Sequence, residues 1–244
     1  PGGGGRTARR PRVIRRLHFL DPVEGRNLSP AWPDALAGAL AAPPGVRPVR
    51  AAACPALALV TPTPHAAVGV AWFDDEAHLD RYERWLTSAE GDVVAAGLRA
   101  AGVDLGASPV VAATEHVLRG ADWLDARWRD GGDKVKHLAL ARRAAGLAPA
   151  EFAERWRGHA GTAGGAVIPD AARGRAYVQH HPLRPEAADP VYDAVTEVYF
   201  DDVDAARARI DWFAQHPEAV RPGNLFGSSR FLLVREELLS LPPG

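Results

Sequence analysis

Methionine is absent from the 244 residues, and cysteine occurs only once, at position 54. A single cysteine cannot form an intramolecular disulfide, and there is no CxxC pair for zinc binding or thiol exchange. Cys54 lies in the apolar run ACPALALV, which favours a buried thiol over a nucleophile. Because position 1 is not methionine either, we expect the natural chain to begin upstream.

Long apolar runs and an excess of one charge are also missing. No segment reaches the roughly 18 apolar residues of a membrane span, and no signal peptide is visible, so we predict a cytoplasmic protein with no membrane partner. The net charge of -1 argues against a nucleic-acid partner. No HExxH, GxSxG or dinucleotide-binding motif occurs, so we predict no metal ion and no organic cofactor.

In the second half of the chain, the spacing of apolar residues changes from one segment to the next. KVKHLALARR (134–143) has the pattern of a strand, and the following segment places Phe152, Trp156 and His159 on one face of a helix. YVQHH and YDAVTEVYF are rich in strand-forming residues. A second helix and a last strand complete a βαββαβ order, which is the ferredoxin-like unit.

The first half repeats this order. Residues 67–86 align without gaps on residues 194–213, with the FDD triplet identical and Trp72 opposite Tyr199. A repeat of about 120 residues implies two copies of one supersecondary unit. We therefore predict an α+β fold in which two tandem ferredoxin-like (βαββαβ) units form an intramolecular dimeric α+β barrel.

The segment RRAAGLAPAEFAERWRGHA, followed by YVQHH and YDAVTEVYFDD, resembles the EthD family signature of the dimeric α+β barrel superfamily. The resemblance covers about residues 134–237 and departs after His159, where GTAGGAV replaces a run containing proline and leucine. We predict a disordered tail at 1–12, a degenerate ferredoxin-like half at 13–120, a linker at 121–133 and an EthD-like ferredoxin-like half at 134–244.

Polar residues found only in the second half are the better site candidates. Histidine titrates near neutral pH, and Glu197, between apolar neighbours, must be solvated, held protonated or paired with an arginine such as Arg175 or Arg230. Strand alternation puts His180 and His181 on opposite faces, so one should face the barrel interior. The predicted catalytic residues are His159, Glu197, His180, Tyr177 and His137, and the predicted substrate-binding residues are Tyr199, Trp156, Trp72 and His181.

The resemblance implies a cofactor-independent enzyme of natural-product biosynthesis acting on an aromatic or polyketide-like small molecule. Histidine, tyrosine and glutamate inside the barrel would drive dehydration, decarboxylation, cyclisation or isomerisation by acid–base chemistry. The alternatives are a cofactorless monooxygenase that oxidises an anthrone-like phenol with O₂, and a non-catalytic ligand-binding or accessory protein. Because one chain can close its own barrel, we expect a monomer (a pseudo-dimer) or a homodimer.

Overall fold

The computed structural model describes residues 13–129, 134–158, 167–183, 190–217 and 224–241. The first half contains β1 (Ile14–Leu20), α1 (Trp32–Leu40), β2 (Arg50–Pro55), β3 (Ala67–Phe73), α2 (Glu76–Leu86), α3 (Ala89–Ala100) and β4 (Val110–Arg119). A short helix, α4 (Ala121–Ala126), follows. The second half contains β5 (Lys134–Arg143), α5 (Pro149–Arg157), α6 (Asp170–Arg173), β6 (Ala176–Pro182), β7 (Ala194–Phe200), α7 (Val203–Gln215) and β8 (Phe226–Leu238).

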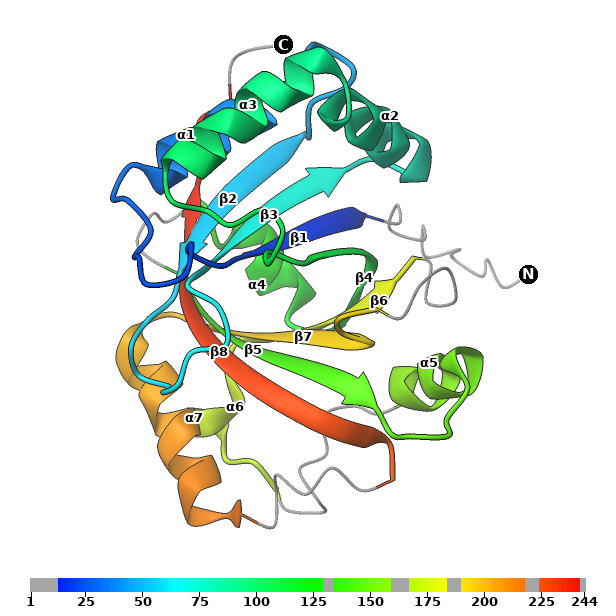
Figure 1. Cartoon of the computed structure of the whole chain (residues 1–244). Coiled ribbons are helices and arrows are strands. Elements are labelled where there is room, and N and C mark those ends of the chain that lie inside the picture. The colour runs from blue at the N-terminus through cyan, green and yellow to red at the C-terminus, as the bar shows by residue number, and fades with distance from the viewer. Residues whose placement is uncertain (1–12, 130–133, 159–166, 184–189, 218–223, 242–244) are drawn as a thin grey trace, which may run out of the picture.

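The eight strands form a closed antiparallel barrel in the order β1-β3-β2-β8-β5-β7-β6-β4. Each half contributes four adjacent strands in ferredoxin-like order, and the halves join where β2 pairs with β8 and β4 pairs with β6. Helices α1, α2 and α3 lie on one side of the barrel, and α5 and α7 lie on the opposite side (Figure 1). The predicted fold class is therefore confirmed.

Strand register makes the two halves comparable residue by residue. Leu17 of β1 faces Val70 of β3, and Leu138 of β5 faces Glu197 of β7. With residues 67–86 aligned on 194–213, position 70 corresponds to 197, and position 15 corresponds to 136. The same reasoning through the pairs β1–β4 and β5–β8 makes Glu115 equivalent to Glu236.

Alternate residues of each strand point into the barrel or towards the helices. One apolar cluster fills part of the barrel interior with side chains from both halves; its members include Leu17, Phe19, Cys54, Val68, Val70, Trp72, Leu138, Leu140, Val195, Leu232 and Val234. Burial raises the pKa of the Cys54 thiol to about 12, so this cysteine is the inert buried thiol that its apolar run predicts.

The helix-facing side of the first half is packed by a large apolar core. Helix α1 lies directly on the middle of the sheet, where a Cβ built on Gly69 would come within 3.0 Å of the Leu36 side chain. In the second half, the equivalent of Gly69 is Thr196, which is half-buried. There the apolar packing divides into one cluster beneath α7 and another beneath α5.

The segment between the halves continues the chain from β4 into α4. Gly120 adopts a φ of +76°, and a Cβ at this position would lie 2.3 Å from the carbonyl oxygen of Arg175, so only glycine fits. Leu124 of α4 then packs with Ala176, Val178 and Tyr199. The predicted linker therefore contains a helix that packs onto the second half.

Candidate functional site

The barrel interior contains a network of buried charged groups. Arg15 forms an ion pair with Glu115 within the first half, and Lys136 Nζ lies 2.9 Å from Glu236 Oε1 within the second half. Because positions 15 and 136 are equivalent, as are 115 and 236, the tandem repeat has produced the same cation–carboxylate pair twice. Arg127, which follows α4, adds a contact of 3.4 Å from its Nε to Glu236 Oε2.

Glu197 connects the two equivalent pairs. One carboxylate oxygen lies 2.8 Å from Lys136 Nζ, and the other lies 2.7 Å from Arg15 Nη1. The hydroxyl of Tyr199 donates to Glu197 Oε2 at 2.7 Å, and His180 Nε2 lies 3.0 Å from the same oxygen. Glu197, His180, Lys136 and Tyr199 are all 0% exposed. Three cationic side chains thus lie beside three carboxylates inside the barrel.

The electrostatics of Glu197 follow from these contacts. Burial alone would raise its pKa, but Lys136 and Arg15 hold the pKa well below the usual range, so the group is a carboxylate at neutral pH. Burial would lower the pKa of Lys136, whereas the nearby Glu197 and Glu236 raise it well above its ordinary value. Glu197 is therefore paired with an arginine, as one of the three expected alternatives has it, but the arginine is Arg15 and not Arg175, which pairs with Asp201.

The expectation of one proton-handling hollow supplied by the second half alone is also wrong. Arg15 and Glu115 of the first half take part in the interior network, and apolar side chains from both halves pack beside it. Sequence alternation placed Glu197 on the same face of its strand as Tyr199, but it could not show that this face would meet opposite charges inside the barrel. The predicted ligand contacts Tyr199 and Trp72 belong to the same interior, with Arg15 lying 4.9 Å over the Trp72 ring.

The opposite side of the second-half sheet has a different character. Its helix-facing residues form the outer face of the second half, made of Tyr177, Gln179, His181, Ala194, Thr196, Val198, His137, Ala139, Ala141, Phe231 and Leu233. Gln179, Thr196, Ala139 and Phe231 form one row across four strands. Ala139, Thr196 and Phe231 are half-buried, so the middle of this face is less tightly covered than its first-half counterpart.

His137 lies in the adjacent row, between Val198 and Leu233. Its ring stacks on Phe231, with centroids 5.3 Å apart and planes at 17°. Burial, with a smaller contribution from the charge of Arg209, lowers the pKa of His137 to about 3. The imidazole is therefore neutral at physiological pH and can accept a proton or a hydrogen bond from a ligand.

Helix α5 forms one wall beside this face because Phe152 and Trp156, one turn apart, turn inward together. Gln179 Nε2 donates to the carbonyl of Trp156 at 3.0 Å, while Gln179 Oε1 lies 3.1 Å from His181 Nε2. The rings of Trp156 and His181 are 4.3 Å apart. A cavity of about 270 Å³ opens here, lined by Thr114, Phe152, Trp156, His181 and Asp193 among others.

Helix α7 forms the other wall and contributes Arg209. Its guanidinium lies 4.7 Å over the ring of Phe213, and Nη1 donates to the carbonyl of Ala172 at 3.0 Å. Its Nε is buried without a hydrogen-bond partner. Burial lowers the pKa of Arg209 to about 10, which Tyr177 opposes and Arg119 reinforces. The positive charge of Arg209 acts to lower the pKa of both His137 and Tyr177.

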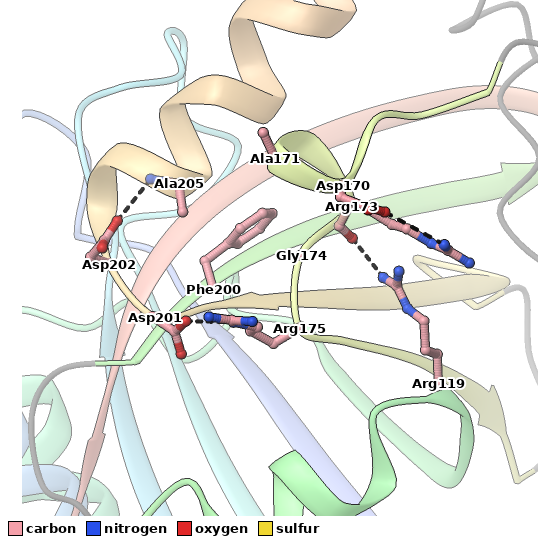
Figure 2. A pocket seen from close by; sticks show the side chains of 10 residues that line it. All are labelled: Arg119, Asp170, Ala171, Arg173, Gly174, Arg175, Phe200, Asp201, Asp202 and Ala205. Carbon is pink, nitrogen blue, oxygen red and sulfur yellow. Dashed lines mark hydrogen bonds and ion pairs between the residues drawn. The ribbon is translucent and has the colours of Figure 1, made fainter.

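A larger cavity, of about 580 Å³, lies at the start of α7 beside α6 (Figure 2). Its arginines already have partners, because Arg175 Nε lies 2.5 Å from Asp201 Oδ2 and Arg119 Nη2 donates to the carbonyl of Arg173 at 2.6 Å. The Arg175–Asp201 pair is exposed to solvent, where ion pairs contribute little. None of the predicted site residues lines this cavity.

The structure therefore divides the predicted site residues between the two faces of one sheet. Glu197, His180, Tyr199 and Trp72 point into the barrel, whereas His137, Tyr177, His181 and Trp156 lie on the helix side. His159 lies outside the described residues. The expected separation of His180 and His181 onto opposite faces is confirmed.

Sequence reasoning missed Arg15, Lys136 and Arg209. The first two carried a signal, since both interrupt apolar strands at equivalent positions of the repeat. Arg209 carried none, because one arginine in an amphipathic helix usually faces solvent. In the portions of the chain that the structure describes, no group of three or more His, Cys, Asp or Glu side chains could hold a metal ion, and no helix is long and apolar enough to cross a membrane.

No protein-family model matches the chain, and no curated protein matches it. Solved structures do resemble it. An anthrone oxidase-like protein superposes with a TM-score of 0.56 at 10% identity, over 93% of this chain and 92% of that one. A candidate monooxygenase from Fusobacterium nucleatum subsp. nucleatum gives a TM-score of 0.50 at 8% identity, over 94% of this chain and 95% of that one. At these identities the likeness shows the fold, that of a dimeric α+β barrel, and the EthD resemblance is not confirmed.

Proposed function

We propose that the chain is a cofactor-independent enzyme that binds an aromatic or polyketide-like small molecule on the outer face of the second half and transfers a proton to or from it. The observation that carries this proposal is the difference between the halves. Where Leu36 covers Gly69 in the first half, the second half has the half-buried Thr196, with Ala139 and Phe231 beside it and a neutral His137 in the next row.

In this proposal His137 accepts the proton, and Tyr177 supplies a hydroxyl in the same row of the sheet. Burial raises the pKa of Tyr177, so its hydroxyl stays protonated and can donate a hydrogen bond to a ligand oxygen. Trp156 and His181 contribute flat rings at the α5 wall, against which an aromatic ligand can pack. His159 remains a candidate from the sequence. In this proposal the interior residues Glu197 and His180 stabilise the barrel and do not contact the substrate.

Removal of a proton from an aromatic substrate gives an anion that can react further in two ways. The resulting anion can eliminate, isomerise or cyclise, which corresponds to the lyase or cyclase reading. The second candidate is oxygenation, in which the anion reacts with O₂ in a cofactorless monooxygenase. The names of the two superposed structures, an anthrone oxidase-like protein and a candidate monooxygenase, favour this second route.

Anthrone is a suitable test substrate for distinguishing these possibilities. It is neutral, it is the keto tautomer of a phenol, and its C10 protons are acidic. Without oxygen, the enzyme should accelerate exchange of the C10 protons for deuterium, measured by ¹H NMR. His137→Gln should slow this exchange by about 10²–10⁴-fold. With oxygen present, uptake at an oxygen electrode would identify the monooxygenase. Exchange no faster than in buffer alone, together with intact anthrone binding, would indicate a ligand-binding protein and refute the proposal.

A further inference from the structure

Arg209 is a half-buried cation that, unlike the cations of the barrel interior, has no carboxylate partner among the described residues. Arg15, Lys136 and Arg127 each lie within ion-pair distance of a glutamate inside the barrel. Arg209 donates instead to the neutral carbonyl of Ala172, and no carboxylate among the described residues forms an ion pair with it. Its Nε is buried and has no partner. Leaving such a buried donor without a hydrogen-bond partner is costly unless a ligand supplies an acceptor.

The neighbours of Arg209 place this charge at the proposed site. Arg209 lies on the α7 wall, and its positive charge acts on His137 and Tyr177, both on the outer face of the second half. The other charged group that acts on Arg209 is Arg119, which has the same sign. Arg209 and Arg119 thus both act on Tyr177, and of the two only Arg119 feels an opposing acid, Asp170. Such an environment favours a ligand with a negative group at this end.

We propose that the substrate is an aromatic acid and that its carboxylate binds the guanidinium of Arg209. This inference rests on the proposed function, whose substrate class it specifies. Arginine suits the task because its planar donors can bind both oxygens of a carboxylate. The Nη1 bond to Ala172 fixes the orientation of the guanidinium, and stacking on Phe213 covers one of its faces. Nε therefore remains available as a donor.

The carboxylate also has a consequence for His137. In the free protein, burial and the charge of Arg209 both disfavour the protonated imidazole. A bound carboxylate offsets the charge of Arg209, so it raises the proton affinity of His137 when substrate is present. His137 would thus be a stronger base towards an acid substrate than towards a neutral analogue.

The test compares anthracene-2-carboxylate with its neutral isostere anthracene-2-carboxamide by isothermal titration calorimetry at pH 7.5. Hydrogen bonds to charged groups predict that the wild-type protein binds the acid about 10- to 100-fold more tightly than the amide. Arg209→Gln should abolish this preference by weakening acid binding alone. Arg209→Lys, which keeps the charge, should retain part of it. Arg207→Gln is the matched control, since Arg207 is exposed on the same helix.

Three results would overturn the inference. These are equal affinity for acid and amide, an acid preference that survives Arg209→Gln, and no binding of the acid at its solubility limit. Thermal unfolding provides a separate check. If Arg209→Gln and Arg209→Lys both lower the melting temperature as much as Arg15→Met does, Arg209 serves the fold and the inference fails. Failure of the anthrone exchange assay with acid selectivity intact would instead remove the proposed catalysis and leave the binding site.

Discussion

Replacing Glu197 by glutamine tests whether the barrel interior is a balanced charge network. Glutamine keeps the size of the side chain but removes its charge, which leaves three buried cations beside two carboxylates. The lost contacts are short, at 2.8 Å to Lys136 Nζ and 2.7 Å to Arg15 Nη1. Removing one member of a buried ion pair costs about 3–5 kcal/mol. We expect Glu197→Gln to lower the free energy of unfolding by about that amount.

A compensated variant separates charge balance from the loss of a single contact. Lys136→Met combined with Glu197→Val removes one charge of each sign, and valine is the residue found at the equivalent position 70. The Arg15–Glu115 and Arg127–Glu236 pairs remain. Contacting sites are not additive, so the double variant should lose about 1–3 kcal/mol less than the sum of the two single variants.

Equilibrium unfolding in urea at pH 7.5, followed by tryptophan fluorescence and far-UV circular dichroism, gives these free energies. Glu237→Gln is the control, because Glu237 is the exposed neighbour of Glu236 on β8 and should change stability by no more than about 0.5 kcal/mol. A cost below about 1 kcal/mol for Glu197→Gln, or strict additivity in the double variant, would refute the network. Either result would mean that Glu197 is protonated or solvated in the folded protein.

Three further predictions concern the repeat, the pH dependence and the helix caps, all measured by urea unfolding. Gly69→Ala should destabilise the protein by about 1–3 kcal/mol because its Cβ would lie 3.0 Å from Leu36, whereas Thr196→Ala at the equivalent half-buried position should cost less than about 1 kcal/mol; equal costs would contradict the difference between the halves. The pKa of His137 is about 3 in the folded protein and near 6.5 in the unfolded chain. The unfolded chain therefore takes up a proton first, and the free energy of unfolding falls as the pH drops below 6.5. Between pH 7.5 and 5.0, His137→Gln should lose about 2 kcal/mol less stability than the wild type, and an unchanged pH dependence would count against burial of this ring. Asp202→Ala should cost about 1 kcal/mol by removing the oxygen that accepts from Ala205 N at 2.8 Å, and no loss would exclude a capping role.

Patterns of a few residues were sufficient to predict the features that depend only on sequence neighbours. An aspartate before a helix is a typical N-cap, and Asp75 and Asp202 of the two FDD triplets both accept a backbone N–H from the residue three positions later. Alternation predicted that His180 and His181 would point to opposite faces, because successive side chains of any strand do so. Apolar surroundings predicted the burial of Cys54, which is 0% exposed.

The location of the candidate site was not predictable in the same way. The sequence placed Tyr177, His180 and Glu197 near one cavity, but the closed barrel separates Tyr177 from the other two by the thickness of the sheet. Which face of a strand becomes the interior depends on strands more than 100 residues away, as the contact of Arg15 with Glu197 illustrates. Only the register of four strands revealed the outer row that contains Thr196.

The sequence by itself determined the βαββαβ repeat, its tandem arrangement and the ends of its helices, because periodicity and capping act over a few residues. The tertiary structure decided which polar groups neutralise one another and which remain unpaired. That decision depends on distances of about 3 Å between residues remote in sequence, over which a buried charge is either stabilised or left uncompensated. Glu197 lies between two cations, whereas Arg209 has no ion pair with a carboxylate in the part of the chain that the structure describes.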